Sequence, residues 1–85
     1  MLKVLFFARI KEQLDCGALE LEWRDAVADL DALQEQLCVE HGDKWREVLG
    51  QDNMIRAVNQ TVVDGSSPPL QDGDEVAFFP PVTGG

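Results

Sequence analysis

The residues best suited to chemistry stand at the end of the chain, where Phe-Phe-Pro-Pro-Val-Thr-Gly-Gly runs from Phe78 to Gly85. The two prolines end sheet pairing and stiffen the chain as it leaves the domain, because proline has no N–H and a fixed φ. Two glycines, which lack a Cβ atom, then fit a narrow channel where any side chain would clash. The pattern predicts that the carboxylate of Gly85 is presented on a thin stalk to the active sites of other proteins.

A carboxylate is a poor electrophile, so the Gly85 carboxylate needs activation before it can carry another group. Adenylation with ATP supplies AMP as a leaving group, and a sulfur donor that displaces AMP leaves a thiocarboxylate. Its sulfur is a nucleophile tethered to a recognisable protein, so the chain contributes positioning more than catalysis. A terminal Gly-Gly pair alone is also typical of flexible ends and cloning scars, and an inert tail stays open as an alternative.

Elsewhere the sequence contains no self-sufficient active site. The single histidine, His41, ends a predicted helix, where a cation complements the helix dipole. Cys16 and Cys38 lack the spacing of metal ligands and are interpreted as a loop thiol and a partly buried apolar residue. No glycine-rich loop precedes a Lys-Ser or Lys-Thr pair for nucleotide phosphates. We therefore expect the chain itself to bind no metal and no cofactor.

The composition indicates one small intracellular domain. The 85 residues, 45% of them hydrophobic, suit a single modest core. The net charge of −9 argues against partners that are nucleic acids or anionic membranes, since both require clustered cations. No apolar stretch is long enough to cross a bilayer, no cleavable leader is recognisable, and cysteines are few. These features favour the cytoplasm.

Local patterns predict strands, then one main helix, then further strands. Asp29 is a credible N-cap before leucines at helical spacing, and Gly42 is a helix stop. Alternation places Phe7 and Phe79 on the strand faces opposite to Phe6 and Phe78. The predicted elements are strands over 2–9, 19–23, 54–58, from 62, and 75–79, a polar connection over 10–15 with the alternative of one helical turn, a helix over 30–41, and a short helical piece over 43–49.

This order predicts an α+β roll, a mixed sheet with one main helix packed on one face. If the first and last strands lie side by side as the central pair, the fold is the ubiquitin-like β-grasp. The predicted domain covers residues 1–80, and residues 81–85 form a flexible Gly-Gly tail.

Three stretches together resemble the small subunit of molybdopterin synthase, the MoaD type of ubiquitin-like sulfur carrier. They are Leu-Lys-Val-Leu-Phe-Phe-Ala at 2–8, Ala-Val-Asn-Gln-Thr at 57–61, and Asp-Gly-Asp-Glu-Val-Ala-Phe-Phe-Pro-Pro-Val-Thr-Gly-Gly at 72–85. The resemblance spans the whole chain but is loose between Asp15 and Asp52. It implies a β-grasp fold and a non-catalytic subunit that donates sulfur to cyclic pyranopterin monophosphate in molybdenum cofactor biosynthesis.

The resemblance also implies partners. An adenylating enzyme uses ATP to activate Gly85, a sulfur donor such as a desulfurase delivers sulfur, and the tail then enters the large subunit of molybdopterin synthase. The implied assembly is a heterotetramer. The residues implied for the tail that enters the partner are Pro80, Pro81, Val82, Thr83 and Gly84, ahead of Gly85, and those implied for the partner interface are Phe7, Val62 and Phe79.

Several alternatives remain at this stage. Phe7 and Phe79 could simply be core residues. The chain could be a sulfur carrier for thiamine synthesis or tRNA thiolation, although the Phe-Phe-Pro-Pro-Val-Thr segment favours molybdopterin. It could also be a ubiquitin-like binding module or protein modifier, in which Gly85 forms an isopeptide bond with a lysine.

Overall fold

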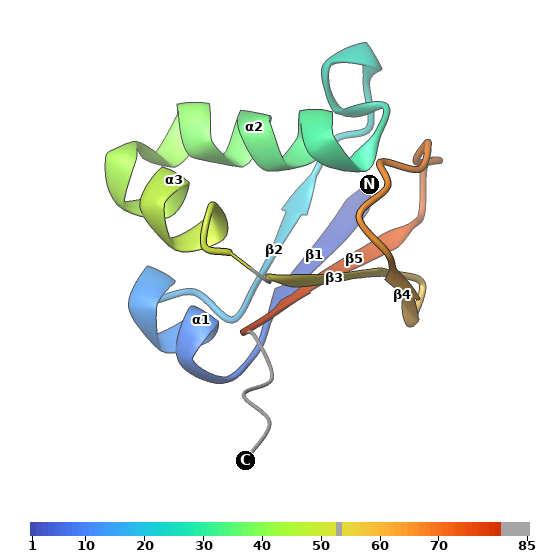
Figure 1. The fold of residues 1–85 in the computed structure, drawn as a ribbon. Helices are drawn as coiled ribbons and strands as arrows, with labels where there is room; N and C mark the ends of the chain where they lie inside the picture. The colour runs from blue at the N-terminus through green and yellow to red at the C-terminus, as the bar shows by residue number, and fades with distance from the viewer. Residues whose placement is uncertain (53, 81–85) are drawn as a thin grey trace.

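A computed structural model describes residues 1–52 and 54–80; the predicted tail, residues 81–85, lies outside them (Figure 1). The strands are β1 (Leu2–Phe6), β2 (Ala18–Leu21), β3 (Ile55–Val58), β4 (Thr61–Val63) and β5 (Glu75–Phe79). The helices are α1 (Ala8–Leu14), the 3-10 helix η1 (Asp25–Val27), α2 (Leu30–His41) and α3 (Asp43–Leu49).

The strands form one mixed sheet in the order β2-β1-β5-β3-β4. The first and last strands, β1 and β5, are neighbours and run parallel, with Phe6 opposite Phe78. The other pairings are antiparallel. Because the central pair joins the two ends of the chain and the main helix lies on one face, the fold is a β-grasp, as predicted.

Helix α2 begins and ends where the sequence predicts. The Asp29 carboxylate accepts a hydrogen bond of 2.8 Å from the backbone N–H of Ala32, which satisfies one of the free donors of the first turn. Gly42 follows the helix with φ of 97°, a conformation that glycine adopts without strain. The buried residues of α2 are Leu30, Leu33, Leu37 and Cys38.

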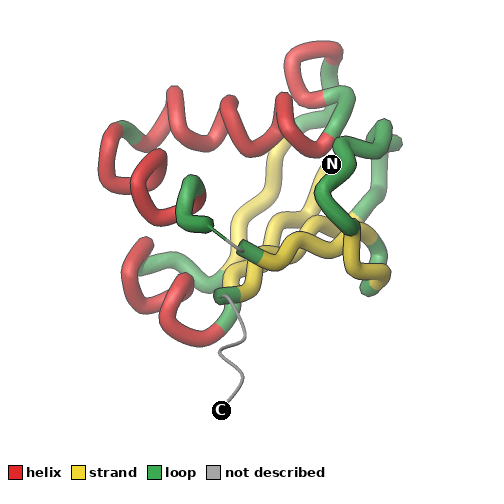
Figure 2. Tube along the Cα trace, viewed as in Figure 1, coloured by secondary structure: helices red, strands yellow, loops and turns green. Residues whose placement is uncertain are grey.

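The core lies between the helices and one face of the sheet (Figure 2). Phe6 is at its centre, stacked on Phe78 with centroids 5.6 Å apart and edge-on to Trp45 at 5.3 Å. Each such aromatic pair adds about 0.5–1.5 kcal/mol to what burial of the rings alone contributes. The α2 side of β1 and β5 is therefore the face that holds the fold together.

The region after β1 differs from the prediction. The strand ends at Phe6 instead of residue 9, and the expected polar connection is the two-turn helix α1, with Ile10 and Leu14 buried on one side. Burying these two side chains, four residues apart, requires a helix at this position. Ala8 has φ of 53°, so the chain turns sharply away from the sheet there. The prediction of a strand that continues to residue 9 is therefore wrong.

Strand β2 ends at Leu21, two residues before the predicted end at Trp23. The Trp23 indole N–H instead donates to the carbonyl of Leu70 at 2.9 Å, which draws the chain toward the loop before β5. A tight turn at Asn59 and Gln60, with φ of 50° and 70°, joins β3 to β4. Across residues 1–52 and 54–80, no helix is long and apolar enough to cross a membrane.

Candidate docking face and C-terminal tail

The face of the sheet turned away from α2 carries a second set of apolar side chains. Strand register places Leu5 beside Ala77, Ala77 beside Ala57, and Ala57 beside Val62 across four neighbouring strands. Because side chains alternate along a strand, all four point to the side opposite the core. We call this surface, together with Phe7 and Phe79, the open face.

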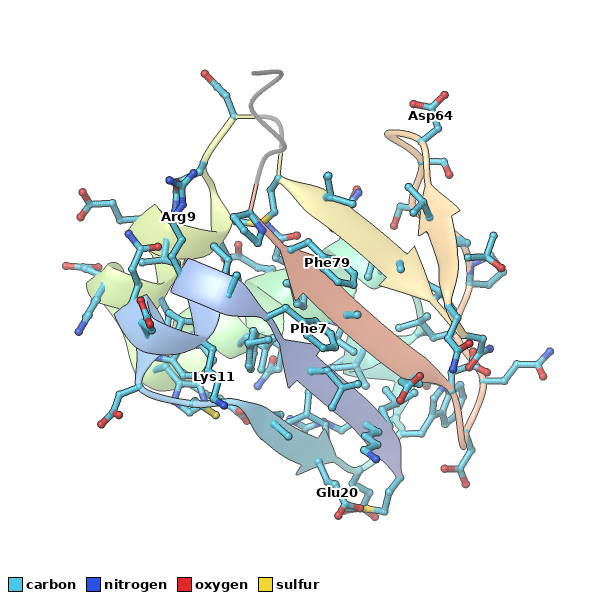
Figure 3. The ribbon with its side chains drawn as sticks, turned by 90° about the horizontal axis from the view of Figure 1, so that it is seen from below. Phe7, Arg9, Lys11, Glu20, Asp64 and Phe79 are labelled. Atoms are coloured by element: carbon cyan, nitrogen blue, oxygen red, sulfur yellow. The ribbon has the colours of Figure 1, made fainter. Side chains whose placement is uncertain are left out.

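Phe7 and Phe79 form an aromatic pair on the open face. Their rings are stacked, with centroids 4.6 Å apart and planes within 4° (Figure 3). The backbone N–H of Phe7 donates to the carbonyl of Phe78 at 3.1 Å, which holds the end of β1 against the end of β5. The Phe7 side chain is nevertheless 39% exposed. The two rings lie on the opposite side of the sheet from the core, so the alternative of core packing does not describe them.

A shallow hollow of about 420 Å³ lies within the open face, and its apolar lining includes Leu5, Phe7, Ala57, Val62, Ala77 and Phe79. Two alanines, Ala57 and Ala77, lie opposite each other in the register between β3 and β5. Their small side chains leave a depression among the larger groups around them. Val62, on the short strand β4, is 65% exposed at the edge of this hollow.

The structure thus brings the three predicted interface residues, Phe7, Val62 and Phe79, together on one surface. Phe79 is the last residue of β5, and Pro80 continues the chain from the same end of the central strand pair. The remaining predicted tail residues, Pro81 to Gly85, lie outside the described residues. Leu5, Ala57 and Ala77 belong to the same surface but were not assigned to the site from sequence, although alternation already places Leu5 with Phe7 and Ala77 with Phe79.

The other candidate groups have structural roles. His41 ends α2 and its ring stacks on Trp45, with centroids 3.9 Å apart. Cys38 is buried in α2, and burial raises the pKa of its thiol, which keeps the sulfur protonated and unreactive. Cys16 is partly buried in the link between α1 and β2. Across the described part of the chain, no three His, Cys, Asp or Glu side chains are grouped as a metal site.

Charge pairs gather on the other side of the molecule. The Arg46 guanidinium donates two hydrogen bonds to Glu35, of 2.9 and 2.8 Å, and these lower the pKa of the Glu35 carboxyl. Arg56 reaches from β3 to Asp31 of α2 at 2.6 Å and also donates to the Gln34 side chain. These pairs join α2 to α3 and to the sheet, and they leave the open face predominantly apolar.

Comparison with known proteins gives a consistent result. Residues 4–85 match the model of the ThiS family. The chain is 45% identical over 85 residues to the molybdopterin synthase sulfur carrier subunit of Haemophilus influenzae, and 44% identical over 88 residues to the subunit of the same name from Escherichia coli. Both comparisons cover 100% of this chain and of the relative.

Among solved structures, the chain resembles one in the protein–protein complex of subunits 1 and 2 of the molybdopterin-converting factor from Helicobacter pylori. The TM-score is 0.65 and the identity 30%, over 99% of this chain and 97% of that one. Because the family model matches residues 4–85 and two relatives match over their full lengths, the chain belongs to the ThiS family of β-grasp proteins.

Proposed function

We propose that this chain is the sulfur-carrier subunit of a molybdopterin synthase and that it works in the cytoplasm. The observation that carries the proposal is full-length identity of 45% and 44% to two subunits of that name. The open face supports it independently, because the apolar surface lies at the same end of the sheet as the start of the tail. The chain donates sulfur as a non-catalytic subunit.

In the proposed cycle, an adenylating enzyme joins the Gly85 carboxylate to the AMP part of ATP and releases pyrophosphate. A sulfur donor such as a desulfurase supplies the sulfur, and where the donor holds it as a persulfide, a thiol reductant releases it as sulfide and is oxidised to a disulfide. The sulfide attacks the acyl carbon and expels AMP, leaving a thiocarboxylate on Gly85. The sulfur is then transferred to cyclic pyranopterin monophosphate. ATP is bound by the partner enzyme, and no cofactor is assigned to this chain.

Tail and open face have separate tasks in this proposal. Pro80, Pro81, Val82, Thr83 and Gly84 form the segment that enters the large subunit, with Gly85 at its tip. Five residues beyond Pro80 reach about 17 Å when extended, enough to place a reacting atom deep inside a partner. Phe7, Val62 and Phe79 bind the surface of the large subunit. The resulting assembly is a heterotetramer, and the Helicobacter pylori complex of subunits 1 and 2 supports a partner of this kind.

Other ThiS-family functions remain as alternatives, namely sulfur carriage for thiamine synthesis or tRNA thiolation, and a ubiquitin-like binding module or modifier. The two named relatives favour molybdopterin over the first pair. A modifier would form isopeptide bonds between Gly85 and lysines, so higher-mass conjugates in cell extract would favour that function.

Intact mass spectrometry tests the proposed chemistry. The chain is incubated with the adenylating enzyme, ATP and a sulfide source, and a variant lacking Gly85 serves as the control. We expect a mass gain equal to the replacement of one oxygen by one sulfur, absent from the control. No gain, with the enzyme shown active on a known carrier, would contradict the proposal.

A further inference from the structure

The four arginines of the described residues differ in whether they form ion pairs. Three of the four lie within 4.0 Å of a carboxylate of α2, and the pairs are Arg24–Glu40, Arg46–Glu35 and Arg56–Asp31. Arg9 is the exception, because it is exposed and forms no ion pair with any residue that the structure describes. Its guanidinium therefore needs an explanation other than an internal ion pair.

Arg9 lies at the end of the sheet from which the chain leaves the domain. It is the second residue of α1, which begins directly after Phe7, and the Phe7 N–H is bonded to Phe78 of β5 at 3.1 Å. Figures 1 and 3 both place α1 near this end of β5, and Figure 3 shows the Arg9 side chain there. Arg9 is thus beside both the open face and the start of the tail.

The stability of α1 does not account for an arginine at this position. The first turn of a helix is the positive end of its dipole, where a cation is disfavoured, and α1 has no acidic residue in that turn. Ala8 precedes Arg9 with φ of 53°, a left-handed conformation that is strained for an L-alanine. The local backbone therefore holds Arg9 in place at a cost to the fold, which is typical of functional positions.

The two other cations near the open face have neighbours in the fold that account for their positions. Lys3 of β1 lies in register between Glu20 of β2 and Glu75 of β5, so it is flanked by opposite charges. The aliphatic stem of Lys11 packs over Gly17, with its Cε 3.0 Å from where a Cβ of that glycine would stand. Only Arg9 among these three lacks such a local role.

We infer that Arg9 is a specificity-determining contact for the large subunit, pairing with a carboxylate at the entrance that takes up the tail. This inference rests on the proposed function. A guanidinium at an interface rim, with no ion-pair partner among the described residues, selects a carboxylate, which it binds with two hydrogen bonds. Because the chain is acidic overall, with a net charge of −9, an acidic group on the partner is attracted at Arg9 and repelled by most of the surrounding surface. The contact therefore sets the orientation in which the tail meets the entrance.

Lys44 provides a matched control for the test. It is also an exposed cation at the second position of a seven-residue helix, α3, and forms no ion pair within the described residues. α3 packs against α2 on the helical side of the sheet, away from the open face. Arg9→Glu and Lys44→Glu each change the net charge by two, from −9 to −11, so the comparison holds the change in net charge constant and varies its location.

The experiment measures the association rate with the cognate large subunit at low and high salt. Rim charges act mainly on association, so we expect Arg9→Glu to slow it about tenfold at roughly 50 mM salt and about twofold at roughly 500 mM. Lys44→Glu should change the rate by less than about twofold. Arg9→Lys should keep most of the association rate, which depends on charge, but should dissociate faster, because an ammonium cannot form the two parallel hydrogen bonds of a guanidinium. Unchanged thermal unfolding of all three variants would show that the fold is intact.

Equal effects of Arg9→Glu and Lys44→Glu would overturn the inference, since only net charge would then matter. A slowing by Arg9→Glu that does not depend on salt would overturn it as well. Failure of the wild-type chain to bind the large subunit would instead overturn the proposed function, and this inference with it.

Discussion

Replacing Phe79 with alanine should separate docking from folding, because its neighbour Phe78 offers an internal comparison. The two phenylalanines are adjacent in β5 and point to opposite faces. Phe78 is fully buried and stacks on Phe6, whereas Phe79 is partly exposed and stacks on Phe7. Removing a fully buried phenylalanine costs about 3–5 kcal/mol of unfolding free energy.

Phe79→Ala should cost much less stability. It removes one aromatic pair, worth about 0.5–1.5 kcal/mol, and only part of a buried surface. We expect a total loss of about 1–2 kcal/mol, which lowers the Tm of a domain of this size by roughly 4–16 °C. Its loss of affinity for the large subunit should be larger, about 2 kcal/mol or more, as for an aromatic residue at the centre of an interface.

Urea unfolding and calorimetric titration with the large subunit measure the two quantities on the same preparations. Phe78→Leu is included, because it keeps the core occupied and the chain folded if Phe78→Ala does not fold. We expect Phe79→Ala to lose more binding than stability and Phe78→Leu to lose more stability than binding. If Phe79→Ala lost as much stability as Phe78→Ala with no separate loss of affinity, the assignment of Phe79 to a docking face would be wrong.

Three further predictions concern the tail, the rim of the hollow and pH. Deletion of Gly85 should abolish thiocarboxylate formation and leave the Tm unchanged; a lower Tm would show that the tail supports the fold. Val62→Ala should weaken large-subunit binding several-fold and cost less than about 0.5 kcal/mol of stability. Val39→Ala on α2 is the control and should change neither, since Val62 and Val39 are 65% and 64% exposed. Equal effects of the two variants in binding titrations would exclude a docking role for Val62. Because Arg46 lowers the pKa of Glu35, this pair stabilises the fold above the ordinary glutamate pKa and is lost as pH falls through the lowered value. Glu35→Gln should therefore reduce the stability lost on acidification, and an unchanged urea midpoint profile against pH would refute this.

Sequence patterns predict best where one signal dominates. The bounds of α2 follow from Asp29, the leucine stripe and Gly42, and those of β5 from a turn at Asp72 to Asp74 followed by alternation. The same patterns could not predict α1. Its buried face has only Ile10 and Leu14, and the run of strand formers before it continues to Ala8 without a break. The left-handed φ of Ala8 is imposed by packing around it, and the propensity of alanine gives no sign of it.

The sequence predicts which face of the strands carries the candidate site, but it does not predict the hollow in that face. Alternation along single strands separates Phe79 from Phe78 without any knowledge of the sheet. The hollow depends on register between strands distant in sequence, which sets Ala57 of β3 directly opposite Ala77 of β5. No local pattern contains that pairing. Arg9 was missed because its significance lies in the absence of a partner among the described residues, which only the tertiary structure reveals.

The position of β5 explains how one small domain can present both a tail and a surface. β5 is hydrogen-bonded on both sides, to β1 and to β3. Near its end, Phe79 is paired with Ile55 of β3, and the Phe78 carbonyl accepts from the Phe7 N–H, so the end of the strand is fixed on both sides. Phe79 therefore has a set position relative to Phe7, and Pro80 begins the tail directly after it. In the proposed function, a partner that binds the open face would therefore meet Pro80, the first residue of the proposed tail, at a defined point. An edge strand, free on one side, would leave that starting point mobile, and binding energy from the face would then do less to position the terminal carboxylate.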